Sequence, residues 1–553
     1  MKIRLLFIAL LLGLSLGCKK SVPFVSNIDT SLHKELGKNL KNPYSVTNMR
    51  SAYASLITNN THLSSRDRTL SSIQGTKLSL ESTQLLQSSN VISAVQGTAI
   101  SKEAITASHY YIKFKPKTLK EYDLLKADSS LVIYPFPIDS ETNNYHANYH
   151  DPSLPANVPT YQYASVPINH KLPNIEYEKL EDLFLPNEQK PNSTIATIKV
   201  KDLVDKSYAQ LMLPDPGDDG GGGGGGGYPP SDPYRNGDDW RPNGRITMYD
   251  EVLGTTIGVE GLKVRARRWF TTYDGITDAN GYYAVDGWFS NPANYWLDFE
   301  RYDFAIIDFV HQSNIELSGP KIEASWNVDF TGFHKYCATI FRAAFHYYYK
   351  DIHGLRRPPQ NSFWARQLKI TALNVTSNPS GITNPIHTWF GINDLVTIAT
   401  LAKSTEYTYS TTIHELAHAA HWDNSNLSFA LSASTATESW AAGVEWYLTR
   451  MEYPNHLGTY WPLGGNYRNV VMDLIDDASQ ISYFDRQQYS GFYNNFGFGA
   501  PNDQVEGYNI VDIQNALINN PTTWNEWKTN IKNNYNNATE QHVDAVFDAW
   551  LSY

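Results

Sequence analysis

The sequence predicts an exported multidomain chain: an N-terminal α+β domain, a glycine-rich linker, a β-sandwich and a mainly helical (α+β) C-terminal domain. The 553 residues are enough for roughly three or four domains of about 150 residues each. The run Gly220–Gly227 has no side chains with which to build a core, so it divides the chain. Short strand-like runs recur in residues 110–167 and 244–318, whereas residues 330–553 show helical spacing of apolar residues.

Composition narrows the class of protein. Hydrophobic residues make up 41% of the chain and charged residues only 18%, which excludes general disorder. The net charge of -11 argues against nucleic-acid binding, which draws on clustered Lys and Arg, so we expect no nucleic-acid partner. A total of 2 Cys excludes both a disulfide-stapled scaffold and a cysteine-rich zinc module.

Residues 1–17 have the pattern of a secretory signal peptide, with basic residues followed by an apolar stretch too short to span a bilayer. The stretch ends at Cys18 and resembles a bacterial lipobox, although Ser15 stands where Leu is usual. We therefore expect lipid anchoring at Cys18, with a plain signal peptide as the alternative. Lys19 and Lys20 replace the Asp that favours the inner membrane, so the resemblance implies an outer-membrane lipoprotein facing the periplasm or the cell surface.

Three segments precede the predicted sandwich. Residues 18–105 are predicted to form a partly helical tether. Residues 106–205 are predicted as a small α+β domain, with mixed helical spacing over 172–188, and they resemble an N-terminal module of Bacteroidota lipoproteins. Residues 206–243 are predicted as a Gly/Pro/Asp linker; a phosphate-binding loop is disfavoured because the G-x-x-x-x-G-K-[ST] pattern is missing.

Residues 244–320 are predicted to form the β-sandwich. Asn280-Gly281 is expected to make a type I′ hairpin turn, because both residues tolerate positive φ. The same turn explains Asp278 and Asn280 better than a calcium site does. The strings GVEGLKV and TDANGYY resemble carboxypeptidase regulatory-like domains, which are transthyretin-like sandwiches accessory to other modules.

The strongest chemical pattern is H-E-x-x-H at His414-Glu415-Leu416-Ala417-His418. On a helix the two His lie about 40° apart and one turn along the axis, which suits two ligands of one Zn²⁺. Glu415 projects beside them, where a carboxylate can take a proton from water. Ser410, Thr411 and Thr412 are predicted to provide the N-cap of this helix.

A third ligand decides the class of site. Metzincins carry a His six residues after the second motif His, and here that position is Asn424. Glu438 follows His418 by 20 residues, on a predicted helix where Ala441 and Ala442 leave room for close approach. The motif with this downstream Glu resembles the gluzincin zinc metallopeptidases.

The gluzincin resemblance implies Zn²⁺ at His414, His418 and Glu438, with Glu415 as general base. It also implies a substrate-binding edge strand, for which residues 390–401 are the natural choice. In the best-known subfamily an Asp four residues after the Glu ligand hydrogen-bonds a zinc-binding His, and here that position is Ala442. Glu445, one helical turn further on, is the candidate to replace it. For His421 we weigh an alternative ligand, a group behind the ligands and, as the favoured interpretation, a surface His.

The resemblance also implies a Tyr or His that stabilises an oxyanion. Candidates are Tyr508, Tyr489, Tyr460 and His387. The sequence thus predicts a membrane-anchored zinc metallopeptidase acting on a protein or peptide. The alternative is a non-catalytic surface binding or adhesion lipoprotein on the same scaffold; the complete set of motif residues favours the enzyme.

Overall fold

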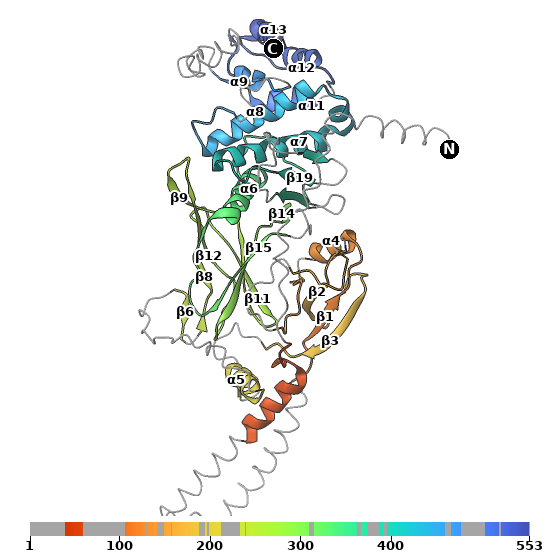
Figure 1. Ribbon diagram of the computed structural model, residues 1–553, viewed down its shortest axis with the longest axis vertical. Coiled ribbons are helices and arrows are strands. Elements are labelled where there is room, and N and C mark those ends of the chain that lie inside the picture. The colour runs from red at the N-terminus through yellow and green to blue at the C-terminus, as the bar shows by residue number, and fades with distance from the viewer. Residues whose placement is uncertain are drawn as a thin grey trace, which may run out of the picture. The chain divides into compact units, whose positions relative to one another are not determined.

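The computed structural model describes residues 39–58, 105–128, 130–140, 149–155, 158–186, 194–195, 198–211, 233–237, 239–308, 314–361, 367–373, 388–390, 395–458, 466–476, 504–518 and 521–551. These ranges combine helices with several β-sheets (Figure 1). The predicted signal peptide, Cys18 and the glycine run lie outside them. Within these ranges, no helix has the length and apolar character that crossing a bilayer requires.

The first sheet has the order β2-β1-β3. Its strands are β1 (His109–Phe114), β2 (Gln162–Pro167) and β3 (Tyr177–Leu183), and the accompanying elements are α4 (Leu119–Ala127), β4 (Thr194–Ile195), β5 (Ile198–Lys199) and α5 (Val200–Gln210). A helix over residues 46–58 packs into the same core through Met49 and Tyr53, so part of the predicted tether belongs to this module.

The helical spacing predicted over residues 172–188 is wrong, because this segment contains strand β3. Its mostly exposed pattern lacks an apolar stripe, and the strand is held by antiparallel pairing with β1. Lys115 of the connection after β1 lies 3.0 Å from Glu178 of β3. Charged side chains are common on edge strands, where they oppose pairing with another chain.

Two further sheets each contain four strands, in the orders β11-β10-β13-β15 and β12-β8-β16, with β9 also paired to β8. The rings of Tyr283 in one sheet and Tyr295 in the other lie 6.4 Å apart, so the sheets share a core. The strands are β8 (Asn243–Asp250), β9 (Thr255–Gly258), β10 (Lys263–Arg268), β11 (Thr271–Ile276), β12 (Tyr282–Ala284), β13 (Ala293–Asp298), β15 (Glu316–Ile322) and β16 (Val328–Phe330), preceded by the short pair β6 (Arg235–Asn236) and β7 (Asp239–Trp240).

The Asn280-Gly281 turn is not the predicted type I′ hairpin. Only Gly281 has positive φ, at 83°, and the turn leads from β11 in one sheet to β12 in the other. The Asp278 carboxylate accepts the backbone N–H groups of Asn280 and Tyr282, each at 2.9 Å. The Asp278 carbonyl also accepts the Gly281 N–H at 2.9 Å, and the Asp278 N–H donates to the Tyr282 carbonyl at 2.8 Å, so backbone and side chain close the turn together. A Cβ on Gly258 would lie 2.2 Å from the Asn280 carbonyl carbon, so β9 also requires glycine there.

A fourth sheet, of order β14-β17-β19-β18, supports the C-terminal helices. Its strands are β14 (Phe304–Asp308), β17 (Leu368–Ala372), β18 (Thr388–Phe390) and β19 (Leu395–Ile398). Part of the segment predicted as sandwich, residues 244–320, therefore belongs to this sheet instead: β14 pairs in parallel with β17. The edge strand predicted within residues 390–401 is also misplaced: β19 lies inside the sheet, and β18, antiparallel to β19, forms its edge.

Helices α6 (Gly332–Tyr349) and α7 (Thr405–Leu431) pack against each other, and both contact the fourth sheet. Helix α8 (Ser434–Glu452) lies against α7 on one side and contacts α9 and α12 (Figure 1). The remaining helices are α9 (Val470–Ile475), α11 (Ile510–Ile518), α12 (Trp524–Asn534) and α13 (Val543–Leu551), with a 3₁₀ turn at Glu540–His542. The helices predicted at the end of the chain are confirmed.

Candidate metal centre

Helices α7 and α8 form an antiparallel hairpin that carries the predicted ligands. Ser404 caps α7 by accepting the Tyr407 N–H. The predicted N-cap at residues 410–412 is wrong: these hydroxyl residues are buried inside the helix, and Thr412 bonds back to the Thr408 carbonyl. The first turn of α7 is held by the β8–β9 connection, since the Thr405 N–H donates to Glu251 at 2.7 Å.

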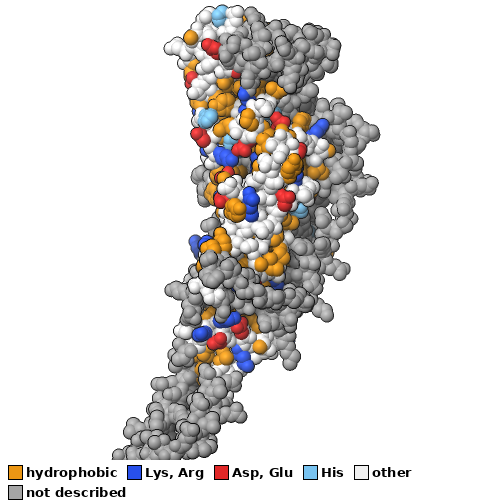
Figure 2. All heavy atoms as spheres, turned by 90° about the vertical axis from the view of Figure 1, so that its left-hand side faces the viewer, with side chains coloured by type: hydrophobic (Ala, Val, Ile, Leu, Met, Phe, Trp, Pro, Cys, Tyr) orange, Lys and Arg blue, Asp and Glu red, His pale blue; other side chains and the backbone are white. Residues whose placement is uncertain are grey.

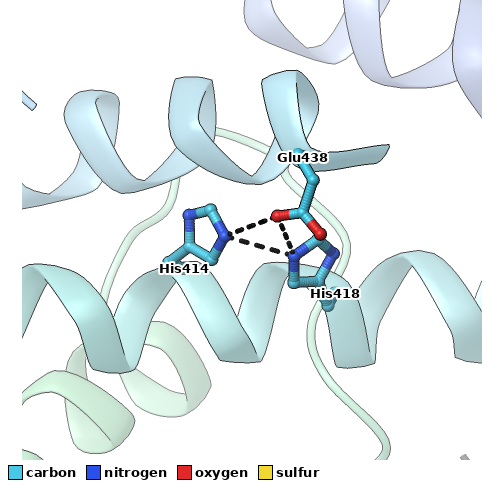
Figure 3. Close-up of side chains that lie close together, drawn as sticks. All are labelled: His414, His418 and Glu438. Atoms are coloured by element: carbon cyan, nitrogen blue, oxygen red, sulfur yellow. Dashed lines mark hydrogen bonds and ion pairs between the residues drawn. The ribbon is translucent and has the colours of Figure 1, made fainter. Parts of the chain in front are cut away.

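The three predicted ligands converge. His414 and His418 project from one face of α7, and Glu438 reaches toward them from α8 (Figure 3). The Nε2 atoms of the two histidines are 3.2 Å apart. Glu438 Oε2 lies 3.2 Å from His414 Nε2 and 3.1 Å from His418 Nε2.

This triangle has the dimensions of a tetrahedral metal site. Metal–ligand bonds of about 2.0 Å place neighbouring ligands about 3.3 Å apart. His414 is completely buried, and the Glu438 side chain is 26% exposed, so the ligand group has one side toward solvent. A group of two imidazoles and one carboxylate fits a divalent metal such as zinc, with a position left for water.

Glu415 is the second residue of the motif and is 1% exposed. Its negative charge acts on His414 and raises the pKa of that imidazole. The Glu415 carboxylate therefore interacts electrostatically with one residue of the ligand group.

A second row of side chains lies behind His414. Glu445 of α8 places Oε2 3.5 Å from His414 Nδ1, the nitrogen that faces away from Glu438. Its other oxygen, Oε1, lies 3.2 Å from His456 Nε2, and His456 Nδ1 lies 2.9 Å from Glu406 Oε1. Glu445 thus occupies the place left by Ala442, as the helical spacing suggested.

The carboxylates favour positive charge throughout this group. Burial alone would lower the pKa of His414, but the contacts with Glu438 and Glu445 raise it to about 10. Burial would raise the pKa of Glu445, yet His414 and His456 lower it to about 2. Burial would also raise the pKa of Glu438, but the ligand histidines His418 and His414 lower it below its ordinary value. A bound cation would be stabilised by the same carboxylates.

His421 is not the surface residue that we favoured. It is 2% exposed, packs edge-on against Phe429, and neither ring nitrogen has a hydrogen-bond partner among the described residues. Burial, followed by the charge of His418, lowers the pKa of His421 to about 3. The ring therefore acts as a neutral packing group at the end of the ligand row.

Of the four candidates for oxyanion stabilisation, only Tyr508 lies within the described ranges. Tyr508 is buried, and its hydroxyl makes no hydrogen bond within the described ranges. The other three candidates, Tyr489, Tyr460 and His387, lie outside these ranges. Instead, the Tyr467 ring lies 5.9 Å from that of His414. No motif marks Tyr467 or His456; both reach the site from segments that follow α8, which only the folded chain brings together.

Outside the ligand group the surface has mixed character. On the face drawn in Figure 2, acidic and basic side chains alternate with hydrophobic ones and neither sign of charge dominates. Comparisons of the chain with family models, curated proteins and solved structures find no match. Function is therefore inferred from the chemistry of the site.

Proposed function

We propose that this protein is a zinc-dependent metallopeptidase of the gluzincin type. One observation carries the proposal: two histidines of an H-E-x-x-H helix and a glutamate of the next helix converge within 3.2 Å of one another. His414, His418 and Glu438 would hold the metal. Oxygen and nitrogen donors without thiolate are typical of catalytic zinc sites.

Zn²⁺ bound there supplies a Lewis acid that polarises the scissile carbonyl and lowers the pKa of water. Glu415 accepts a proton from the attacking water and delivers it to the leaving amine. Its burial beside the ligands keeps the carboxylate close to the reacting atoms. His414 is oriented from behind by Glu445, so that Nε2 faces Glu438.

The remaining parts of the chain take supporting roles in this proposal. The two four-stranded sheets would form a carboxypeptidase regulatory-like sandwich, and the lipidated Cys18 would anchor the enzyme in the outer membrane. The substrate would be a protein or peptide. Among the described residues on the side drawn in Figure 2, acidic and basic side chains are interspersed.

Metal analysis combined with a cleavage assay tests the proposal. The wild-type chain should bind about one zinc per molecule and cleave an unstructured protein, and a chelator should abolish cleavage until zinc is restored. Glu415→Gln should keep the metal but lose at least about 10²-fold in kcat, because the general base is removed.

Glu438→Ala is the matched variant, because it should lose the metal as well as the activity. Wild-type protein that binds no zinc, or Glu415→Gln that cleaves as fast as wild type, would overturn the proposal.

A further inference from the structure

Two buried side chains and one half-buried side chain continue the site beyond its ligands. Glu406 lies in the first turn of α7, Glu445 in the middle of α8, and His456 in the segment that follows α8. They connect in the order Glu406, His456, Glu445 and then His414, with distances of 2.9, 3.2 and 3.5 Å between facing atoms. Glu445 and His456 are 0% and 4% exposed, so water does not substitute for these contacts.

We propose that His456 is a positioning residue which, together with Glu406, fixes Glu445 against His414 and so determines which nitrogen of His414 faces the metal. The inference rests on the proposed function and extends it to residues outside the motif.

The two ring nitrogens of His414 face different partners. A carboxylate behind a ligand histidine accepts the hydrogen of the far nitrogen, which leaves the near nitrogen free to coordinate. Glu445 Oε2 lies on this far side, in an ion-pair contact of 3.5 Å with Nδ1, while Nε2 faces Glu438 and His418. With a single partner, the Glu445 carboxylate would be free to rotate away.

His456 removes that freedom. Its Nε2 faces Glu445 Oε1, the oxygen that does not face His414, so the two Glu445 oxygens have separate partners. Its Nδ1 faces Glu406, which fixes the His456 ring in turn. Both nitrogens of His456 thus act as donors to carboxylates, and charge-assisted hydrogen bonds of this kind are the strong ones.

Substitution of His456 by Gln tests the proposal on the full-length protein. His456→Gln should weaken Zn²⁺ binding by roughly tenfold or more, because loss of outer-shell partners costs roughly 10–100-fold in metal affinity or activity. It should also alter the visible absorption of the Co²⁺-substituted protein, which reports ligand orientation. His346→Gln is the matched control, since that buried histidine bonds Tyr409 and has no contact with the ligands among the described residues.

The outcomes separate the two proposals. Wild-type protein that binds neither Zn²⁺ nor Co²⁺ overturns the proposed function. Wild-type protein that binds both, together with His456→Gln of unchanged affinity and Co²⁺ spectrum, overturns only the role of His456. If His456→Gln fails to fold, Glu406→Gln replaces it: Glu406 is 27% exposed at its side chain, and the same spectral change is expected with a smaller loss of affinity.

Discussion

At the scale of single residues, Tyr467 is a candidate that the chain places beside the metal ligands. Its ring lies 5.9 Å from that of His414. The segment that carries it is held next to Glu438, because the Arg468 N–H donates to Ser439 Oγ at 2.9 Å. A tyrosine in this position is suited to donate its hydroxyl to an oxyanion.

We therefore expect Tyr467→Phe to keep its zinc and to lose about 10²-fold in kcat, the effect of removing one oxyanion donor. Steady-state kinetics with metal analysis of the same sample measures this. Tyr508→Phe is the control, because the buried Tyr508 hydroxyl has Glu540 as its electrostatic neighbour. Equal rates for the two variants would remove Tyr467 from the mechanism.

The ligands were predictable from the sequence because they sit at fixed helical spacings. His414 and His418 are one turn apart, and Glu438 follows on the next helix at a face lined by alanines. His456, Tyr467 and the burial of His421 depend on how later segments fold back on α7 and α8. Local periodicity contains no information about such contacts, so these residues emerge only from the tertiary structure.

At the scale of elements, the spacing between α8 and α9 depends on one glycine. A Cβ on Gly443 would lie 2.4 Å from the Val471 Cβ, closer than real Cβ atoms approach. Helix α8 carries both Glu438 and Glu445, so its position determines the geometry of the site.

Gly443→Ala should destabilise the protein by about 1–3 kcal/mol through overpacking. A loss of stability would be informative, because helix propensity alone predicts a gain: alanine favours a helix by about 1 kcal/mol over glycine. Urea denaturation measures the loss, and zinc affinity should fall with it. In a Val471→Ala background the penalty should shrink in part, since the contacts of 2.5 and 2.7 Å with the two Val471 Cγ atoms are gone while the Cβ contact remains. An unchanged penalty would contradict the packing explanation.

Element types were predicted best where the apolar pattern is regular, as in the helices that follow residue 330. The prediction of helical spacing for the β3 segment was wrong because this edge strand carries charged residues and has no alternation of apolar and polar residues. The type I′ turn predicted at Asn280 was wrong for another reason. The turn starts at Asp278, whose carbonyl accepts the Gly281 N–H and whose carboxylate accepts the N–H groups of Asn280 and Tyr282, and in this turn only Gly281 has positive φ.

At the scale of the whole molecule, a group of charged residues joins three parts of the chain. Lys126 of α4 forms an ion pair at 2.5 Å with Glu300, which follows β13. Lys369 of β17, in the sheet beneath the C-terminal helices, experiences the charges of both residues. Hence charged residues of the N-terminal module, the paired sheets and the C-terminal part interact with one another.

Lys369 makes this junction sensitive to pH. Burial, reinforced by the charge of Lys126, lowers the pKa of Lys369 from 10.5 to about 7. Between these values the unfolded chain binds more protons than the folded chain, so the free energy of unfolding rises with pH. Below pH 7 Lys369 is charged in both the folded and the unfolded chain, so the full destabilisation from burying the charged lysine is present. Lys369→Met should therefore be more stable than wild type at neutral pH, with a difference that closes as the pH approaches 10.5.

Urea denaturation of the Lys369→Met and wild-type proteins across this pH range measures the difference directly. Lys201→Met is the control: Lys201 lies on α5, is 41% exposed at its side chain and pairs with Asp205 at 3.3 Å. A surface pair of this kind contributes less than about 1 kcal/mol, so its removal should leave the pH profile parallel to wild type. If Lys369→Met also ran parallel to wild type, the lysine would titrate as in the unfolded chain, and its burial at this junction would be refuted.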